Sequence, residues 1–188
     1  MDYFESETYR KQDYKKQALQ KGVYEECSFE NCDFSNSDLN DISFVDCRFT
    51  HSNLSLANVT NTKFNGCLFK ECKMLGVKFQ VCNTFGLTVE FVGCNLTDAQ
   101  FTSLPLQNTI FTKCNLQFVD FTEADLESSK IKDCDLADAT FYKTNLVKSN
   151  FIGSTGFVIN PSENSILKAT FSLNSLEGLL YQYKLTIV

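Results

Sequence analysis

Large apolar side chains recur at every fifth position along most of the chain. The run extends from Tyr24 to Phe79 and resumes from Phe91 to Phe151, and all 25 of its positions are apolar. These positions hold 13 of the 18 phenylalanines, so the aromatic residues follow the repeat and are not spread through the sequence. An internal period of this kind is typical of a repeat protein whose stacked units share one core.

A second row of mostly small residues precedes the large ones by two positions. Cysteine, serine, alanine and threonine dominate this row, with bulky exceptions such as Ile42 and Leu104. The two rows together indicate that one large and one small side chain point inward in every five residues.

A period of five fits neither regular secondary structure. Five residues rotate an α-helix by about 500°, so an apolar stripe would leave any one face. On a flat strand an odd step places the side chain on the opposite face. The chain must therefore bend once in each repeat, with a short extended segment followed by a turn. Several such corners close a coil, and stacked coils bury the large residues along an axis.

The repeat resembles the pentapeptide-repeat family, whose consensus is Ala-(Asp/Asn)-Leu followed by two variable residues. Matching runs are Ala124-Asp125-Leu126, Cys134-Asp135-Leu136, Thr144-Asn145-Leu146 and Ser37-Asp38-Leu39. The resemblance implies an all-β fold, a right-handed quadrilateral β-helix with 20 residues per coil. If two residues are inserted between Phe79 and Phe91, one wall holds a column of phenylalanines: Phe29, Phe49, Phe69, Phe91 and Phe111.

Three segments are expected along the chain. Residues 1–21 are an N-terminal lead-in segment, residues 22–156 the pentapeptide-repeat β-helix, and residues 157–188 a C-terminal cap and dimerisation segment. In the tail the five-residue period is lost. Asn174 and Glu177 have capping-box spacing, and leucines follow at helical intervals, which predicts a helical cap of about ten residues. The alternation of residues 184–188 predicts a short final strand.

Composition narrows the partners of such a rod. The 23 acidic and 17 basic residues give a net charge of −6, which disfavours direct binding to nucleic acid or to anionic membranes. The N-terminal residues contain no apolar signal segment, and no stretch approaches 18 apolar residues. We therefore expect a cytoplasmic protein without a membrane partner.

The nine cysteines are explained by the repeat. They occupy the small inward position, and Cys27, Cys47 and Cys67 recur at intervals of 20 residues. Cysteine in such a place acts as a small apolar residue, and a reducing compartment favours free thiols. A redox or metal-binding role is the alternative, although zinc would need four convergent ligands.

Candidate catalytic chemistry is sparse. His51 is the single histidine, and its place in the repeat points outward. No nucleophile-elbow, phosphate-loop or dinucleotide-binding motif occurs. We therefore expect a non-enzymatic protein with no catalytic residues, no metal and no cofactor.

Acidic residues are dense between positions 120 and 138, a segment that contains seven acidic and only two basic residues. One interpretation is that they are coil corners, because Asp and Asn suit turns. The other is that an acidic rod imitates DNA toward a basic groove. Phe85, at the register break, is expected to turn outward. The candidate partner-binding residues are Asp120, Glu123, Asp125, Glu127 and Phe85.

The C-terminal residues resemble one particular group within the pentapeptide-repeat family. The run from Ile159-Asn160-Pro161 to Phe171-Ser172-Leu173, followed by a leucine-rich segment, is similar to the C-terminus of the Qnr and McbG-like group. The resemblance implies a homodimer joined through its C-termini. The candidate interface residues are Phe171, Leu173, Leu176, Leu179, Leu180 and Tyr183.

The same resemblance implies a function. Members of the group bind DNA gyrase or topoisomerase IV and modulate sensitivity to quinolones or related toxins. Several also carry two long loops on the rod, whereas this chain has only the short break near Gly86. The favoured hypothesis is a DNA-mimicking, topoisomerase-binding dimer. The alternative is a pentapeptide-repeat scaffold for another protein partner.

Overall fold

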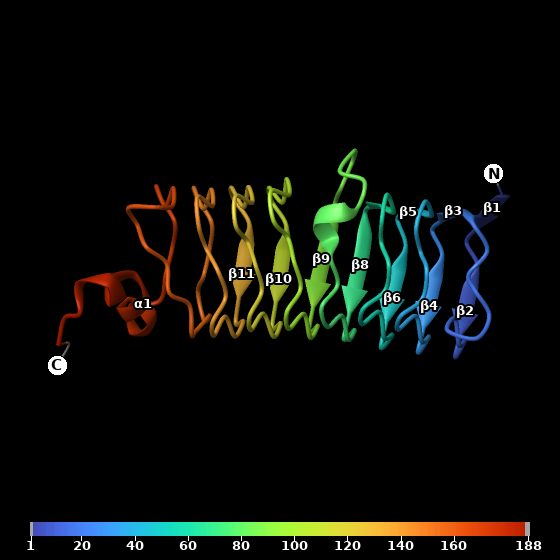
Figure 1. Ribbon diagram of the computed structural model, residues 1–188, viewed down its shortest axis with the longest axis horizontal. Helices are drawn as coiled ribbons and strands as arrows, with labels where there is room; N and C mark the ends of the chain where they lie inside the picture. Colours follow the sequence, from blue (N-terminus) through green and yellow to red (C-terminus); the bar gives the residue numbers. More distant parts are fainter. Residues whose placement is uncertain (1, 187–188) are drawn as a thin grey trace.

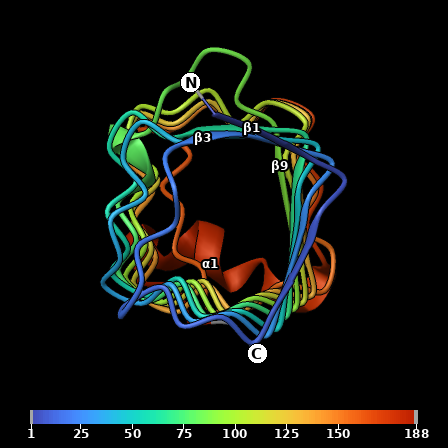
Figure 2. The same cartoon turned by 90° about the vertical axis from the view of Figure 1, so that its right-hand side faces the viewer.

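The chain winds into a straight rod of stacked, four-sided coils (Figures 1 and 2). The computed structural model describes residues 2–186. Every described strand pair is parallel and joins neighbouring coils, so that Phe29 lies beside Phe49 and Phe49 beside Phe69. This 20-residue register confirms the right-handed quadrilateral β-helix expected from the five-residue period.

Two of the four walls carry regular strands. The first wall is a four-stranded sheet of β1 (Asp2–Glu5), β3 (Gly22–Glu25), β5 (Ser43–Val45) and β7 (Lys63–Asn65). The second wall is a seven-stranded sheet of β2 (Thr8–Arg10), β4 (Ser28–Glu30), β6 (Arg48–Thr50), β8 (Cys67–Lys70), β9 (Val89–Val92), β10 (Ile110–Thr112) and β11 (Lys130–Lys132).

The third and fourth walls are joined by isolated β-bridges. Asn53 pairs with Lys73 on the third wall, and Gln100 pairs with Asp120 on the fourth. Their inward columns are Phe34, Leu54, Met74, Leu96 and Leu116 on the third wall, and Leu39, Val59, Phe79, Phe101 and Phe121 on the fourth, all buried.

Aromatic rings fill the axis of the rod in two directions. Along the second wall, Phe91 stacks on Phe111 with ring centroids 5.1 Å apart. Across the axis, Phe91 meets Phe101 of the fourth wall edge to face at 6.0 Å. Both geometries are favourable for aromatic pairs. From Phe91 to Leu126 the phenylalanines of the second and fourth walls therefore face each other, and the leucines of the first and third walls complete the layer.

The register break is an insertion of two residues, as the sequence predicts. Lys63 pairs with Asn83 at an interval of 20 residues, whereas Phe69 pairs with Phe91 at an interval of 22. A 3₁₀ turn, η1 (Phe79–Val81), precedes the insertion. Thr84 and Gly86 are exposed at the break, and Leu87 packs against the core in place of the missing large residue. A loop projects from the rod here, between β8 and β9 in Figure 1.

The coil stack extends past both expected boundaries. β1 pairs with β3, and Phe4 stacks on Tyr24 with centroids 4.6 Å apart. At the other end Asn150 pairs with Thr170, and Phe171 stacks on Phe151 at 5.1 Å. Residues 2–20 are thus a coil and not a lead-in, and the last coil reaches residue 171. The five-residue spacing persists in the first coil, at Phe4, Tyr9, Tyr14 and Leu19, without the consensus residues around it.

The C-terminal cap differs from the single helix predicted. Two 3₁₀ turns, η2 (Leu173–Ser175) and η3 (Tyr181–Tyr183), flank α1 (Glu177–Leu180). None of the three has a side-chain capping bond, so the predicted capping box is not formed. The cap is shaped by contact with the coil below it. A Cβ on Gly178 would lie 2.1 Å from the carbonyl oxygen of Phe157, and the amide of Ile159 donates to the Gly178 carbonyl at 3.0 Å.

The chain leaves the cap through a left-handed residue, Lys184. Leu185 and Thr186 form no strand, which corrects that part of the prediction, and the last two residues of the predicted strand lie outside the described residues. Figure 2 places α1 within the outline of the coils, so the cap covers part of the C-terminal end of the stack. Among residues 2–186 no helix has the length and apolar character to cross a membrane.

Candidate interaction surfaces

An Asp or Asn immediately before the central residue has a structural task. The side chain of Asp120 accepts the amide of Thr122 at 2.8 Å, and that of Asp125 accepts the amide of Glu127 at 3.1 Å. The residue two places after each centre then adopts a left-handed conformation, with φ of 58° at Glu123. Asp and Asn therefore stabilise the turn at the corner by accepting a backbone amide. This agrees with the interpretation of the acidic residues as coil corners.

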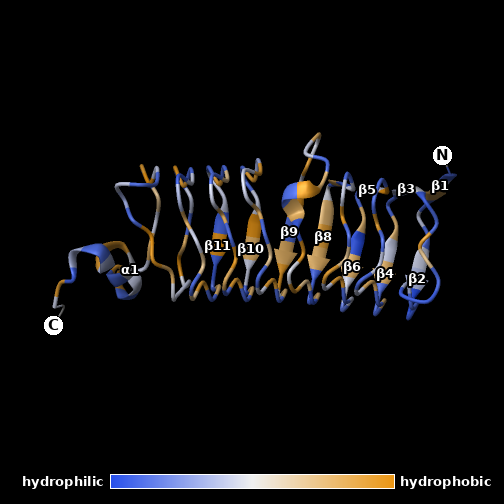
Figure 3. Ribbon diagram, in the orientation of Figure 1, coloured by the Kyte–Doolittle hydropathy of each residue, from blue (hydrophilic) through white to orange (hydrophobic). Residues whose placement is uncertain are grey.

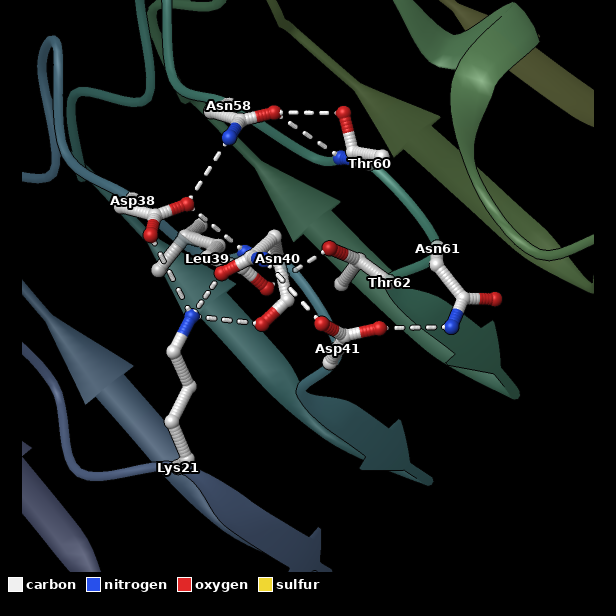
Figure 4. Close-up of polar contacts among 9 residues, drawn as sticks. All are labelled: Lys21, Asp38, Leu39, Asn40, Asp41, Asn58, Thr60, Asn61 and Thr62. Atoms are coloured by element: carbon white, nitrogen blue, oxygen red, sulfur yellow. Dashed lines mark hydrogen bonds and ion pairs between the residues drawn. The ribbon is translucent and has the colours of Figure 1, made fainter.

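The same side chains also bridge neighbouring coils, as Figure 4 shows for the edge between the fourth and first walls. The amide group of Asn58 donates to Asp38 at 2.8 Å, and that of Asn61 donates to Asp41 at 2.7 Å. Lys21 adds a third cross-coil contact, because its ammonium lies 3.4 Å from an oxygen of Asp38. The acids of this N-terminal edge are therefore largely occupied by neighbours.

The register places the four predicted partner-binding acids along the C-terminal continuation of that edge. Asp120 follows Gln100 on the fourth wall, Glu123 lies at the corner, and Asp125 follows Pro105 on the first wall. Glu127 lies two residues further along the same wall. We call these four residues the acidic edge.

The four carboxylates of the acidic edge differ in how many ion pairs and hydrogen bonds they form. Glu127 is in an ion pair with Lys148, with nitrogen and oxygen 2.9 Å apart. Asp125 accepts hydrogen bonds from Asn145 at 2.7 Å and from Gln107. Glu123 is exposed and has only a long bond, 3.3 Å, from the hydroxyl of Ser103. The free negative charge is therefore greatest at the corner.

Phe85 lies at the tip of the projecting loop, and its side chain is 84% exposed. Asn83 orients the loop by accepting the amide of Phe85 at 3.0 Å. The loop rises from the first wall, because Asn83 pairs with Lys63, and it precedes the acidic edge by two coils. Two coils span about 10 Å of rod. Phe85 and the acidic edge thus lie on the same side of the molecule.

The six predicted interface residues divide into two groups. Phe171 and Leu179 pack against the core of their own chain, and Leu176 and Leu180 are half-buried. Leu173 and Tyr183 are exposed, by 82% and 59%. The six residues do not form a single exposed helical stripe, since 3₁₀ turns flank α1 and four of the six are at least half-buried.

The structure adds apolar residues at this end that the sequence pattern did not single out. Tyr181 and Leu185 are exposed by 71% and 59%. Together with Phe157, Leu180 and Gln182 they line a hollow of about 820 Å³ between the cap and the last coil. The amide nitrogen and oxygen of Gln182 are buried without a hydrogen-bond partner among the described residues. The alternation of apolar and polar residues over positions 181–185 could have pointed to these exposed side chains.

The thiols are buried and free, which agrees with the structural interpretation of the cysteines. Burial raises the pKa of Cys47 to about 12 and that of Cys82 to about 11, so both are protonated at neutral pH. Residues 2–186 contain no group of three or more potential metal ligands. His51 is half-exposed at a corner, with its Nδ1 3.0 Å from Glu71, as expected for a surface imidazole.

These features define a parallel β-solenoid that presents extended surfaces and a capped end, the architecture of a binding scaffold. The model of the pentapeptide repeat region matches residues 24–90 and 87–156, so the chain belongs to the pentapeptide-repeat family. The 20-residue coil that the resemblance implies is confirmed by the register of the strand pairs.

Solved structures with a TM-score above 0.5 show the same fold. A trypsin-treated variant of QnrB1, a plasmid-mediated fluoroquinolone resistance protein, has a TM-score of 0.54 and 16% identity, over 99% of this chain and 97% of that one. HetL, involved in heterocyst differentiation regulation in the cyanobacterium Nostoc, has a TM-score of 0.46 and 15% identity, over 89% of this chain and 84% of that one. No curated protein matches the chain.

Proposed function

We propose that this protein is a non-enzymatic, DNA-mimicking rod that binds a type II topoisomerase, DNA gyrase or topoisomerase IV. By doing so it modulates sensitivity to quinolones or related toxins. The observation that carries the proposal is the acidic edge, in which Asp120, Glu123, Asp125 and Glu127 gather around one corner of a single coil. The similarity along the whole chain to QnrB1, a fluoroquinolone resistance protein, supports the same assignment.

The charge geometry suits a groove shaped for phosphates. The four carboxylates lie on one coil and form a compact patch of negative charge, which complements the positive lining of such a groove. Attraction between this patch and a basic groove steers association and weakens as salt screens it. The exposed ring of Phe85 supplies an apolar anchor on the same side.

The active form in this proposal is a homodimer joined through the C-termini. Leu173, Tyr181, Tyr183 and Leu185 are exposed apolar residues around the cap, and Gln182 has unsatisfied polar atoms in the hollow between cap and coil. A second copy would cover these groups. The dimer would bring two acidic edges toward its centre, each between two and three coils from the C-terminal cap. A cytoplasmic location is part of the proposal, because nine free thiols suit a reducing compartment.

A supercoiling assay with purified gyrase, with and without ciprofloxacin, tests the proposal. The test variant carries Asp120→Asn, Glu123→Gln, Asp125→Asn and Glu127→Gln, which keep size and turn acceptors. The matched control replaces four exposed acids of the N-terminal half with amides: Glu5, Glu26, Asp41 and Asp46. The wild type and the control are expected to alter drug-inhibited supercoiling, and the test variant to lose the effect.

The same assay separates the two hypotheses. Loss of the effect in both variants would show that only total charge matters. No effect of the wild type on gyrase or topoisomerase IV would remove the topoisomerase assignment and leave the general scaffold. Two observations favour that scaffold as the second candidate: the structural hydrogen bonds of Asp120 and Asp125.

A further inference from the structure

Basic residues of the C-terminal half are collected on one wall of the rod. Residues 94–165 contain nine acidic and five basic side chains. The register places four of the five bases on the second wall or its edges: Lys113, Lys130, Lys132 and Lys148. Of the nine acids, only Asp133 lies there. The second wall therefore has a sign of charge opposite to that of the acidic edge.

Three of these lysines gather on β10 and β11. Lys130 and Lys132 flank the buried Ile131 on one strand, so both point outward. The amide of Lys113 donates to the carbonyl of Lys132 at 2.9 Å, which brings the third lysine beside them. None of the three takes part in an ion pair within residues 2–186.

Aliphatic side chains are interleaved with these charges. Ile110 pairs with Lys130 across the strands and is half-buried on the outer side, and Ile152 is 47% exposed one coil further on. Figure 3 faces this wall and shows an apolar β10 beside a β11 with hydrophilic ends. We call Lys113, Lys130, Lys132, Ile110 and Ile152 the lysine surface.

We propose that the lysine surface is a second docking site, and that its occupant is an acidic amphipathic segment of a protein partner. Unpaired ammonium groups match carboxylates, and the isoleucines match apolar side chains between them. A nucleic acid fits less well. Aliphatic side chains gain nothing from phosphates, and neither arginine of the chain, Arg10 or Arg48, lies on this surface to grip them bidentately.

The position of the lysine surface makes it independent of the acidic edge. It lies on the second wall, whereas the acidic edge lies on the fourth and first walls. One rod can therefore hold a basic partner and an acidic partner at the same coils. The inference does not rest on the topoisomerase proposal, and its test contains no topoisomerase.

Fluorescence anisotropy of the intact protein with a fluorescein-labelled amphipathic peptide of glutamate and leucine tests the site. The test variant is Lys113→Gln, Lys130→Gln and Lys132→Gln. The matched control is Lys63→Gln, Lys73→Gln and Lys78→Gln, three exposed lysines of the other walls that form no ion pair with a described residue. The loss of three ion pairs is expected to weaken peptide binding about tenfold, and the control to change it less than about twofold.

Circular dichroism checks that both triple variants keep the wild-type fold. An Ile110→Gln, Ile152→Gln double variant is expected to weaken binding as well, because the apolar contacts are part of the site. Equal losses in the two triple variants, or no binding of the peptide to the wild type, would overturn the proposal. So would tighter binding of random-sequence duplex DNA or phosphatidylglycerol vesicles that the test variant abolishes.

Discussion

Within one repeat, each residue position has its own physical task. The central residue fills the axis, and the residue two before it closes the gap between walls. The residue just before the centre accepts the amide of the residue just after it, as Asp120 does for Thr122. The residue two after the centre turns left-handed, a conformation that Asn and Asp tolerate well. Each position of the family consensus therefore corresponds to one of these structural roles.

Two corners depart from that chemistry. Leu56 and Phe118 are left-handed, with φ of 57° and 58°, and both are more than half exposed. Every other non-glycine residue with positive φ is polar or charged among those described. The side chain of Leu56 lies over Gly76, where a Cβ would approach it to 2.9 Å, so it covers bare backbone on the next coil. Nothing in the structure explains Phe118.

The stacked core sets the first prediction. Phe111 is fully buried, stacks on Phe91 at 5.1 Å and meets Phe121 edge to face at 6.0 Å. Phe111→Ala is expected to lower the free energy of unfolding by about 3–5 kcal/mol, because it leaves a cavity in a closely packed axis. Thr112→Ala, on the outer side of the same strand, should change it by less than about 0.5 kcal/mol. Equal urea midpoints for the two variants would contradict the register.

A carboxylate near the N-terminal end predicts a pH dependence. Asp33 is partly buried, which raises its pKa, but the ion pair with Lys15 and hydrogen bonds from Ser35 prevail and hold the pKa at about 2. The pKa of an aspartate in the unfolded chain is about 3.9. The folded state therefore gains stability from ionised Asp33 above about pH 4, and loses it as the pH falls toward 2.

Thermal unfolding of the wild type and Asp33→Asn as a function of pH checks this. The wild type is expected to have the higher Tm at pH 7, and the difference should shrink to near zero at about pH 2. Asp138→Asn serves as control, since Asp138 is an exposed corner residue that forms no ion pair within residues 2–186. A difference between wild type and Asp33→Asn that persists unchanged at low pH would show that charge is not its source.

At the scale of the element, the projecting loop shows how a solenoid absorbs an insertion. The two extra residues leave the strand pairs on both sides intact, with Phe69 beside Phe91 in β8 and β9. Leu87 folds back to seal the gap, and Phe85 turns into solvent. The insertion is therefore accommodated within one coil.

Two alanine variants of this loop are expected to behave differently. Leu87→Ala should lower the free energy of unfolding by about 1–2 kcal/mol, because Leu87 packs against the core. Phe85→Ala should leave it within about 0.5 kcal/mol, since the ring is 84% exposed. Chemical denaturation measures both. A larger loss for Phe85→Ala than for Leu87→Ala would mean that the ring and the leucine have exchanged places.

Across the whole molecule, the two ends of the rod are finished in different ways. The N-terminal coil ends in partly buried rings, Phe4 and Tyr9, whereas the C-terminal coil is covered by η2, α1 and η3. Exposed apolar side chains gather around the cap, including Leu173 and Tyr181. A solenoid that exposes such groups at one end has a surface suited to a second copy.

Light scattering on the intact protein tests the proposed dimer. The wild type is expected to be a dimer at micromolar concentration, and Leu173→Ser, Tyr181→Ser and Tyr183→Ser together should give a monomer with an unchanged coil stack, because all three side chains are exposed. The control variant is Tyr3→Ser, Leu56→Ser and Phe118→Ser, which removes exposed apolar residues far from the cap. A monomeric wild type would refute the dimer.

The coil stack could be predicted from the sequence alone because each repeat contacts only its neighbours. The five-residue spacing determined the inward columns, the inserted residues at the break and the burial of the cysteines, since each follows from local geometry that recurs. The extent of the stack was underestimated, because Phe4, Tyr9 and Phe171 keep the spacing without the consensus around them.

Only the tertiary structure decided which side of the rod each charge occupies. Acids that are close in the sequence, such as Asp125 and Asp135, lie on different walls, while Lys113 and Lys132 become neighbours across coils. The cap was decided there too: α1 packs through Gly178 closely against Phe157 and is flanked by two 3₁₀ turns, where the leucine spacing alone predicts one helix. The packing of the repeats is periodic, so it can be predicted from spacing in the sequence. The charge distribution on the walls and the shape of the cap depend instead on contacts between residues about 20 or more positions apart.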